Sequence, residues 1–148
     1  MQIRRIERDD LDEHYLNLRS QLSPLPHDSC NANFDKIWST FVNDSNHHVI
    51  VAVQKIYDSP KYANLVVGTG SLLIERKLTG TIAGRIEDVV ILQEYRKCGM
   101  GTAIIDGLID IATQEKCYKI ILHCSDKNIP FYNRLGFLKV DNGMKLVL

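Results

Sequence analysis

The chain has 148 residues, a size that suits one domain with its own hydrophobic core. Its 18 basic residues balance 18 acidic ones, which argues against nucleic-acid or membrane partners recruited by a general electrostatic field. No apolar run is long enough to span a bilayer, and residues 1–6 lack the apolar segment of a secretory signal, so we expect a cytoplasmic protein. The cysteines form no C-x-x-C pair and have no histidine at zinc-ligand spacing, which predicts free, mostly buried thiols and no metal site: Cys30, Cys98, Cys117 and Cys124.

The N-terminal third predicts one strand and two helices. Residues 2–6 alternate polar and apolar side chains, as a strand does. A helix is predicted next, which Asp9 or Asp10 can cap and which ends before Pro24. Its apolar stripe consists of Leu11, Tyr15, Leu18 and Leu22. A second helix is predicted over residues 34–41. Its apolar side chains share one face and are expected in the core, although this region could also close over a ligand: Phe34, Ile37, Trp38 and Phe41.

Three strands are predicted in the middle of the chain, over residues 48–54, 65–74 and 86–92. Gly68 and Gly70 indicate a bend or bulge in the second of them. Residues 75–84 are expected to connect the second strand to the third. The third is almost unbroken apolar sequence after its first charges, which is typical of a central strand buried on both faces.

The last third predicts a helix over residues 102–116 capped by Thr102, a buried strand over 118–124, and a short helix over 126–135. A terminal hairpin of residues 137–140 and 144–148 is expected around the turn sequence Asp-Asn-Gly. The element order is β-α-α-β-β-β-α-β-α-β-β, without repeats or linker composition. It predicts a single mixed α/β (α+β) domain over residues 1–148.

A short loop with two glycines, Gly99 and Gly101, joins the 86–92 strand to the 102–116 helix. Strand, glycine loop and helix in this order place backbone N–H groups and the positive end of a helix dipole together, which suits a phosphate or pyrophosphate. The third glycine of a dinucleotide-binding loop and the Lys-Ser/Thr pair of a Walker loop are both missing from this sequence.

The pattern R-x-x-G-x-G after an apolar strand resembles the acetyl-CoA pyrophosphate loop of the GNAT superfamily of N-acetyltransferases. Three further segments are similar to the glucosamine-6-phosphate N-acetyltransferase family: S-L-L-I-E-R-K at 71–77, I-E-D-V-V at 86–90, and C-Y-K-I-I-L-H-C at 117–124, running on to Asn128 and Phe131-Tyr132. The resemblance covers residues 65–140 closely and the N-terminal third loosely. It implies a GNAT-like domain whose central, mostly antiparallel mixed sheet is flanked by helices.

The resemblance also implies acetyl-CoA as co-substrate, no metal, and a set of residues that bind the coenzyme. Strand residues would bond the pantetheine as an added strand: Val89, Val90 and Ile91. Loop and helix-start residues would hold the pyrophosphate: Arg96, Lys97, Cys98, Gly99, Met100, Gly101 and Thr102. Asn128 matches a position that contacts the coenzyme. Tyr132 matches a tyrosine that contacts the coenzyme and protonates the leaving thiolate; the alternative is a half-buried tyrosine with a satisfied hydroxyl.

Two charged clusters match positions that bind the amino-sugar phosphate. Glu87 and Asp88 open an apolar strand, where buried charges need partners, so a site role is plausible from the residues alone; solvation at an exposed strand end is the alternative. The resemblance implies that this pair contacts the sugar. It implies phosphate binding by a charged stretch that is otherwise a solvated surface: Glu75, Arg76 and Lys77. Ser23 aligns with a substrate threonine of the family.

His123 is a departure from the family, which often has aspartate at this position, near the substrate amine. A neutral imidazole could accept the amine proton directly or through water. Alternatively, the sugar amine sheds its proton before binding and needs no dedicated base. The substitution also leaves the identity of the acceptor open.

The resulting prediction is an enzyme that transfers acetyl from acetyl-CoA to the amine of glucosamine 6-phosphate by direct attack, for UDP-N-acetylglucosamine synthesis. Cys98, Cys117 and Cys124 are then non-nucleophilic, and the resemblance implies a homodimer with shared active sites. The nearest alternative is another acceptor, such as a polyamine, a different amino sugar or a protein amine. The other is a non-catalytic acyl-CoA-binding module, against which Tyr132 and Asn128 argue.

Overall fold

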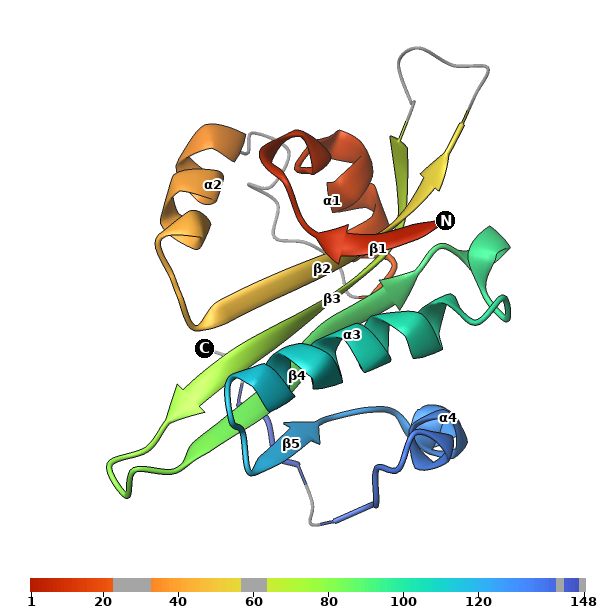
Figure 1. Cartoon of the computed structure of the whole chain (residues 1–148). Helices are drawn as coiled ribbons and strands as arrows, with labels where there is room; N and C mark the ends of the chain where they lie inside the picture. The colour runs from red at the N-terminus through yellow and green to blue at the C-terminus, as the bar shows by residue number, and fades with distance from the viewer. Residues whose placement is uncertain (23–32, 57–63, 141–142, 147–148) are drawn as a thin grey trace.

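A computed structural model describes residues 1–22, 33–56, 64–140 and 143–146. One open sheet has the strand order β1-β2-β3-β4-β5 (Figure 1). The first four strands are antiparallel neighbours and β5 lies parallel to β4, which confirms the predicted mostly antiparallel mixed sheet. The strands are β1 Gln2–Arg5, β2 His47–Lys55, β3 Asn64–Arg76, β4 Ile82–Ile91 and β5 Lys119–Leu122.

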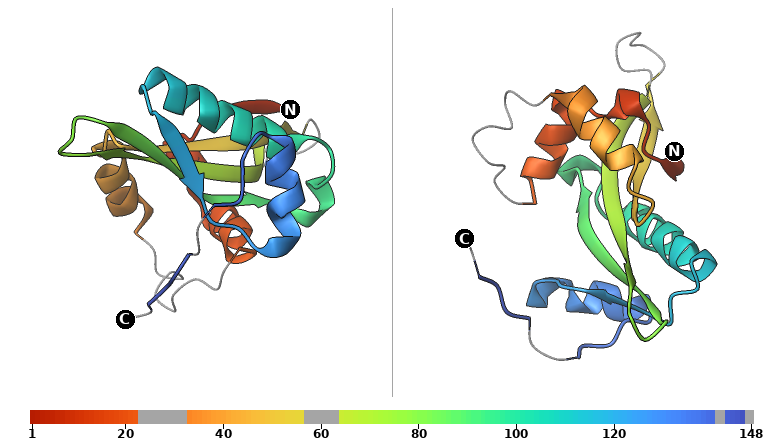
Figure 2. Two further views of the ribbon diagram at one scale, coloured as in Figure 1. Left: turned by 90° about the horizontal axis from the view of Figure 1, so that it is seen from below. Right: turned by 90° about the vertical axis from the view of Figure 1, so that its left-hand side faces the viewer.

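Helices cover both faces of the sheet (Figure 2): α3 lies on one face, and α1 and α2 lie on the other. The helices are α1 Glu13–Ser20, α2 Phe34–Val42, α3 Met100–Gln114 and α4 Ile129–Arg134. Short 3-10 turns at Arg8–Asp10, Gln93–Tyr95 and Asp126–Asn128 precede α1, α3 and α4. This order confirms the prediction up to the terminal hairpin.

The main core lies between α3 and the sheet, because the apolar stripe of α3 is fully buried there through Ile104, Ile105 and Leu108. The helix approaches the sheet so closely that a Cβ on Gly70 would lie 2.7 Å from Cγ2 of Ile104. The register in which β3 pairs with β4 also shifts at Gly70, between Thr69 and Ser71. This shift confirms the predicted irregularity in β3. This shift shapes the strand that carries the candidate site.

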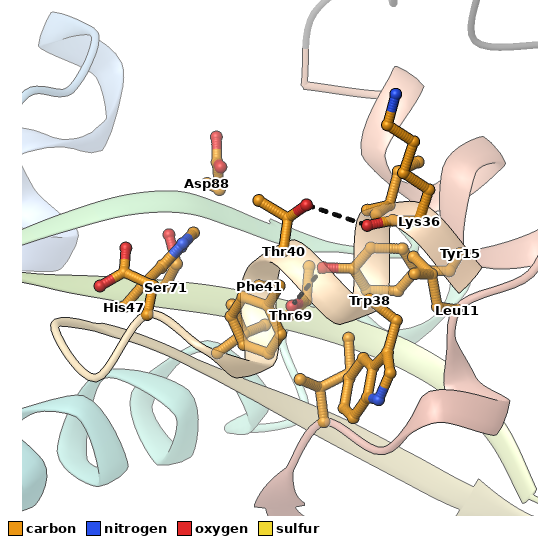
Figure 3. Close-up of a pocket in the computed structure, with 14 residues that line it drawn as sticks. Leu11, Tyr15, Lys36, Trp38, Thr40, Phe41, His47, Thr69, Ser71 and Asp88 are labelled. Atoms are coloured by element: carbon orange, nitrogen blue, oxygen red, sulfur yellow. Dashed lines mark hydrogen bonds between the residues drawn. The ribbon is translucent and has the colours of Figure 1, made fainter. Parts of the chain in front are cut away.

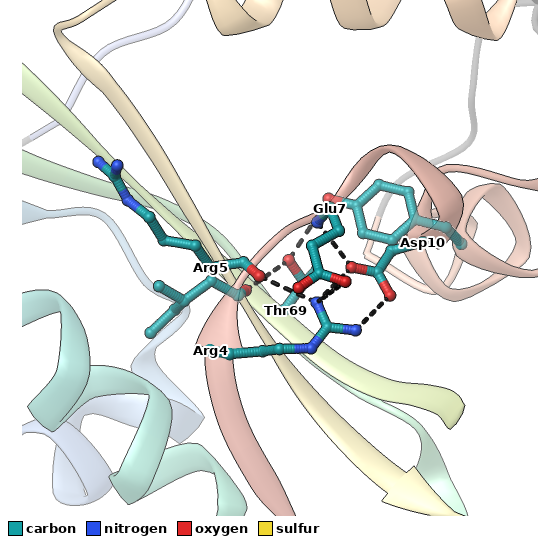
Figure 4. Close-up of polar contacts among 7 residues, drawn as sticks. Arg4, Arg5, Glu7, Asp10 and Thr69 are labelled. Atoms are coloured by element: carbon teal, nitrogen blue, oxygen red, sulfur yellow. Dashed lines mark hydrogen bonds and ion pairs between the residues drawn. The ribbon is translucent and has the colours of Figure 1, made fainter. Parts of the chain in front are cut away.

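A buried ion pair ties β1 to the turn before α1 (Figure 4). Arg4 Nη1 and Nη2 donate to Asp10 Oδ2 and Oδ1 at 2.6 and 2.8 Å, and the backbone N–H of Glu7 donates to Oδ2 at 2.7 Å. Asp10 is therefore engaged before the helix begins. The predicted cap at Asp9 or Asp10 is wrong: Asp12 caps α1 by accepting from the backbone N–H of Tyr15 at 2.8 Å.

The connection between β3 and β4 is shorter than predicted, because both strands continue into residues that were assigned to it. Glu75 pairs with Ala83 and Arg76 with Ile82, which leaves residues 77–81 as the hairpin turn. Charged residues remain in the ladder here because Arg85 on β4 bonds Glu75 across the strands.

The C-terminal elements depart most from prediction. Strand β5 has four residues, none of them fully buried, instead of a buried strand over 118–124. Within the described residues 137–140 and 143–146 no strand is present, so the predicted terminal hairpin is not found there; Asp141 and Asn142 lie outside the described residues. An isolated hairpin is marginal without a further strand or helix against it. Four apolar side chains of this segment instead face solvent: Leu138, Val140, Met144 and Leu146.

The three thiols that the structure describes are free but not mostly buried. Cys98 lies exposed in the glycine loop, Cys124 is exposed after β5, and Cys117 is partly buried; Cys30 lies outside the described residues. In the part of the chain that the structure describes, no group of three or more His, Cys, Asp or Glu side chains is arranged to hold a metal ion. None of the described helices has the length and apolar character needed to cross a membrane.

Candidate active site

Strand β4 and the edge strand β5 separate halfway along β4. Pairing of β4 with β5 runs from Ala83↔Lys119 to Ile86↔Leu122 and then stops, while β4 continues to Ile91. Over residues 87–91, β4 therefore has a strand partner among the described residues on its β3 side only. The predicted Val89, Val90 and Ile91 lie on this free edge. Unpaired backbone N–H and C=O groups on a strand edge can bond an extended ligand as if it were another strand.

The same part of β4 is bent. Asp88 has φ +60°, in the left-handed region, next to the shifted pairing with β3. Glu87 is exposed and Asp88 half-buried, so the prediction of a strand buried on both faces is wrong here. Ser71 Oγ donates to the carbonyl of Glu87 at 3.1 Å and ties the bent segment to β3. The predicted acidic pair thus stands on a kinked strand beside the free edge.

The glycine loop ends in a helix N-terminus that is open to solvent. Gly99, with φ +80°, is the N-cap of α3, so the helix starts at Met100 and the predicted cap at Thr102 is wrong. The backbone N–H groups of the first turn have no partner inside the helix, and the dipole of this 15-residue helix favours an anion there. Met100 can offer only its backbone, because its side chain is buried in the core.

The loop is also connected to the free edge of β4. Arg96 Nε donates to the carbonyl of Ile91 at 2.9 Å, which fixes the strand end next to the anion site. Lys97 is exposed with φ +64°, and Cys98 Sγ lies 3.5 Å from the carbonyl of Arg96. The structure therefore brings the predicted pyrophosphate residues and the predicted pantetheine strand into one continuous surface.

Helix α4 packs against the start of α3 and carries the predicted acid. A Cβ on Gly101 would lie 3.3 Å from Cζ of Phe131, and the neighbouring Tyr132 is half-buried edge-on to Phe131 and Phe137. Burial, and then the nearby Cys124, raise the pKa of Tyr132 above that of an ordinary tyrosine, so its phenol stays protonated. No hydrogen bond among the described residues engages this hydroxyl, so it can still donate.

Two other predicted residues accompany Tyr132. His123 is exposed just after β5 and lines a cavity of about 420 Å³ together with Tyr132 and Cys124. Its ring lies against the C-terminal segment, since a Cβ on Gly143 would be 2.7 Å from Cδ2 of His123. Asn128 precedes α4 and its side chain makes no capping hydrogen bond, so its amide is available to a ligand.

A larger cavity, of about 550 Å³, opens between α1, α2 and the sheet (Figure 3). Trp38 and Phe41 of α2 form part of its apolar wall, and Thr69, Ser71 and Asp88 contribute polar groups. The expectation that the α2 aromatics are core residues is wrong, because no residue of α2 is fully buried. The alternative, that this region closes over a ligand, agrees with the cavity.

The predicted phosphate-binding stretch does not reach these residues within one chain. Arg76 Nη2 bonds Glu115 at 3.0 Å, at the end of α3 opposite to the glycine loop. Glu75 bonds Arg85, and Lys77 lies 3.9 Å from Glu75. Because Glu75 pairs with a residue five positions before Asp88, the two are separated by roughly 17 Å along the strand. Ser23 lies outside the described residues.

Arg19 contacts a predicted site residue, and the sequence analysis did not single it out. Its Nη2 lies 2.8 Å from Oδ1 of Asp88, which joins the last turn of α1 to the bent segment of β4. One signal in the sequence could have found it: Arg19 follows Tyr15 by four residues and Leu18 by one, so it borders the buried stripe of α1.

Comparison with known proteins agrees with this arrangement. Residues 6–137 match the model of the acetyltransferase (GNAT) family. A glucosamine 6-phosphate N-acetyltransferase of Trypanosoma brucei brucei is 33% identical over all of this chain and 96% of that protein. A probable glucosamine 6-phosphate N-acetyltransferase of Oryza sativa subsp. japonica is 31% identical over the whole chain and 87% of that protein.

Solved structures give the same result. The crystal structure of glucosamine-6-phosphate N-acetyltransferase from Arabidopsis thaliana superposes with a TM-score of 0.85 at 27% identity, covering 99% of this chain and 97% of that one. An acetyltransferase of Trypanosoma brucei superposes with a TM-score of 0.83 at 34% identity, covering 99% of both chains. The chain therefore belongs to the acetyltransferase (GNAT) family, alongside relatives that are named glucosamine 6-phosphate N-acetyltransferases.

Proposed function

We propose that this chain is a glucosamine 6-phosphate N-acetyltransferase, which uses acetyl-CoA to acetylate the sugar amine and forms N-acetylglucosamine 6-phosphate. The observation that carries this proposal is the meeting of three features: the free edge of β4, the anion-binding start of α3, and the half-buried Tyr132 on α4. The names of two relatives that match the full length of the chain at more than 30% identity support the acceptor.

The residues present fit the coenzyme at its pantetheine arm and at its pyrophosphate. The edge of β4 at Val89, Val90 and Ile91, where the carbonyl of Ile91 is already bonded by Arg96, can bond the amides of the pantetheine arm, and the first turn of α3 can hold the pyrophosphate. Arg96 bonds the carbonyl of Ile91 at the end of this edge, Lys97 is exposed in the glycine loop, and Asn128 directly precedes α4, which supports their proposed contacts with the coenzyme. Acetyl-CoA supplies an activated acetyl group, which the chain positions between the edge of β4 and Tyr132.

In the proposed reaction, the neutral amine attacks the thioester carbonyl directly. A backbone N–H of β4 polarises that carbonyl, and the protonated phenol of Tyr132 donates its proton to the departing sulfur. No acyl-enzyme is required. Burial raises the pKa of Cys117 and disfavours its thiolate, which supports a direct transfer without that cysteine. The amine proton leaves either to His123, directly or through water, or to solvent before the sugar binds.

The acceptor side of the site involves Glu87, Asp88 and His123 on the segment where β4 and β5 separate. The charged stretch of residues 75–77 is too far from Asp88 to hold the phosphate of the same sugar. We therefore propose a homodimer in which the partner subunit contributes this stretch. The exposed apolar side chains of the C-terminal segment support a second chain packing there: Leu138, Val140, Met144 and Leu146.

The first test is acetyl-CoA-dependent thiol release with glucosamine 6-phosphate and with unphosphorylated glucosamine at matched concentrations. We expect kcat/KM to be higher for the phosphorylated sugar by roughly 100-fold, because charge-assisted bonds to the phosphate stabilise its complex. Equal rates, or none, would refute the acceptor while leaving the coenzyme site in place. Light scattering should give twice the chain mass of 16.9 kDa. A monomer that turns over normally would refute the shared site.

The alternative acceptor with support on this chain is another primary amine, because His123 replaces the aspartate found in the similar family. A panel containing spermidine, glucosamine and a lysine peptide tests it in the same assay. With glucosamine 6-phosphate as acceptor, the product would feed the cytoplasmic synthesis of UDP-N-acetylglucosamine.

A further inference from the structure

We infer that Arg19 is a positioning residue for the acceptor amine, acting through its ion pair with Asp88. This inference rests on the proposed function and deepens it, because it assigns a role in acceptor binding to a residue of α1. The pair joins two elements that are far apart in the sequence. Arg19 Nη2 lies 2.8 Å from Asp88 Oδ1, and the side chains are 18% and 42% exposed.

The conformation of Asp88 needs an external partner. The left-handed backbone conformation of Asp88, with φ +60°, costs free energy in a non-glycine residue, roughly as much as a weak hydrogen bond contributes. Such a conformation persists only where surrounding contacts hold it. The pairing of β3 with β4 shifts at this point, so the ladder itself does not fix the side chain. The ion pair with Arg19 supplies this constraint from α1. It orients the carboxylate at the place where the free edge of β4 begins.

The Asp88 carboxylate keeps capacity for a ligand. Asp88 lines the 550 Å³ cavity, and among the described residues Arg19 is the one side chain that forms an ion pair with it, with its shortest distance to Oδ1. The carboxylate therefore keeps acceptor capacity, nearest at Oδ2, for the ammonium, amine or hydroxyl groups of an acceptor. Tyr15, one turn before Arg19 on α1, lines the same cavity, and its hydroxyl lies 3.4 Å from Thr69 Oγ1. The cavity wall at this point is thus built by α1 and β4 together.

The hydrogen bonding of the Arg19 guanidinium is incomplete, unlike that expected of a purely structural ion pair. Its Nη1 is buried and has no hydrogen-bond partner among the described residues. A buried donor without a partner costs free energy, so this geometry is not optimised for stability. An arrangement that is not optimised for stability agrees with a role for this cation beside Asp88 at the site.

The role of the Arg19 cation follows from the protonation state that the acceptor amine needs in order to react. An amine attacks only in its neutral form, and an isolated carboxylate beside it stabilises the ammonium form instead. The positive charge of Arg19 offsets the negative charge of Asp88 in the half-buried pair. The acceptor can then bond Oδ2 without being held as an unreactive ammonium ion. Removal of Arg19 should lower kcat/KM for the acceptor and move the acidic limb of the kcat profile to higher pH.

The test compares Arg19→Met, Arg19→Lys, Asp88→Asn and the double variant Arg19→Met/Asp88→Asn in steady-state assays with glucosamine 6-phosphate. Arg19→Met should lower kcat/KM for the sugar by about 30-fold, at the low end for breaking a half-buried charge pair, with the KM for acetyl-CoA within about twofold of wild type. The pH of half-maximal kcat should rise by about one unit. Arg19→Lys should restore part of both effects, and the double variant should return the pH profile to its wild-type position.

The matched control is Arg8→Met, which removes another arginine–aspartate pair, to Asp35 at 2.6 Å, away from β4. It should leave both KM values and the pH profile unchanged. The inference is overturned if Arg19→Met keeps the wild-type pH profile and the wild-type kcat/KM for the sugar, or if the KM for acetyl-CoA rises as much as kcat/KM for the sugar falls. Should Arg19→Met fail to fold, Arg19→Lys and Asp88→Asn carry the same comparison. Failure of the proposed function gives a different result, because the wild-type enzyme would then be inactive on glucosamine 6-phosphate. In that case the variants are compared on the amine that the wild-type enzyme does acetylate.

Discussion

The buried pair of Arg4 and Asp10 should be among the most stabilising polar contacts in the described structure, and the substitution Asp10→Ala tests it. The two side chains are 17% and 6% exposed and share two hydrogen bonds of 2.6 and 2.8 Å. Removing the carboxylate leaves a largely buried guanidinium and the Glu7 N–H without their partner. Breaking such a pair costs about 3–5 kcal/mol. Glu7 lies 3.7 Å from Arg4 and can offset part of this loss, so we expect about 3 kcal/mol.

Thermal unfolding followed by calorimetry measures the effect. An unfolding entropy of about 2 cal/mol/K per residue converts 3 kcal/mol into a Tm lower by roughly 10 °C. The control Asp35→Ala breaks the more exposed pair with Arg8, at 2.6 Å and with side chains 36% and 86% exposed. It should lower the Tm by less than about 3 °C, because exposed pairs contribute about 0–1 kcal/mol.

The double variant Arg4→Met/Asp10→Leu separates the cost of an unpaired charge from the value of the pair. Apolar side chains of similar volume often replace a buried ion pair without loss, so we expect the double variant to regain at least half of the lost Tm. An Asp10→Ala protein within 3 °C of wild type would refute the reasoning. So would a double variant that is less stable than Asp10→Ala.

Three further predictions concern the site and the response to pH. Tyr132→Phe should lower kcat by about 100-fold with little change in the KM for acetyl-CoA, because it removes the proton donor and keeps the half-buried ring; unchanged turnover would reopen the non-catalytic alternative. Gly99→Ala and Gly80→Ala both place alanine at φ +80° with no atom within 4 Å of the new Cβ, so each should lose about 1 kcal/mol of unfolding free energy. Only Gly99→Ala should also raise the KM for acetyl-CoA, and equal KM values would contradict the anion site. Burial, and then Arg5, lower the pKa of His48, so the folded state favours the neutral ring; stability should be full above pH 6.5 and fall as the pH drops below it, by at most about 1.4 kcal/mol per unit. His48→Gln should flatten this part of a denaturation series, and an unchanged slope would contradict the assignment.

Local sequence was sufficient to predict most elements of the fold. Alternation of polar and apolar residues found β1, the strand predicted over residues 48–54 corresponds to β2, and helical spacing found the buried stripe of α3. The order strand, glycine loop and helix also predicted the anion site, because a helix N-terminus presents its N–H groups whatever lies around it. These features depend on residues that are neighbours in the chain.

The local signals failed where the outcome depends on a distant partner. The aromatics of α2 have the spacing of core residues, but they line a cavity because α2 stands away from the sheet there. The apolar C-terminal segment has the composition of a hairpin, but within the described residues it has no strand to pair with. Periodicity shows that a face is apolar and does not show what covers it.

The sequence by itself determined the family and the glycine loop, and it pointed to Tyr132 as the proposed acid, because the residues concerned stand in short contiguous motifs. Only the tertiary structure decided that β4 and β5 separate after Ile86, that Asp88 is held by Arg19 of α1, and that residues 75–77 lie far from Asp88 in the same chain. These facts arise from the pairing register and from contacts between elements many residues apart. Such contacts depend on how the whole chain packs, and the spacing within one segment does not encode them.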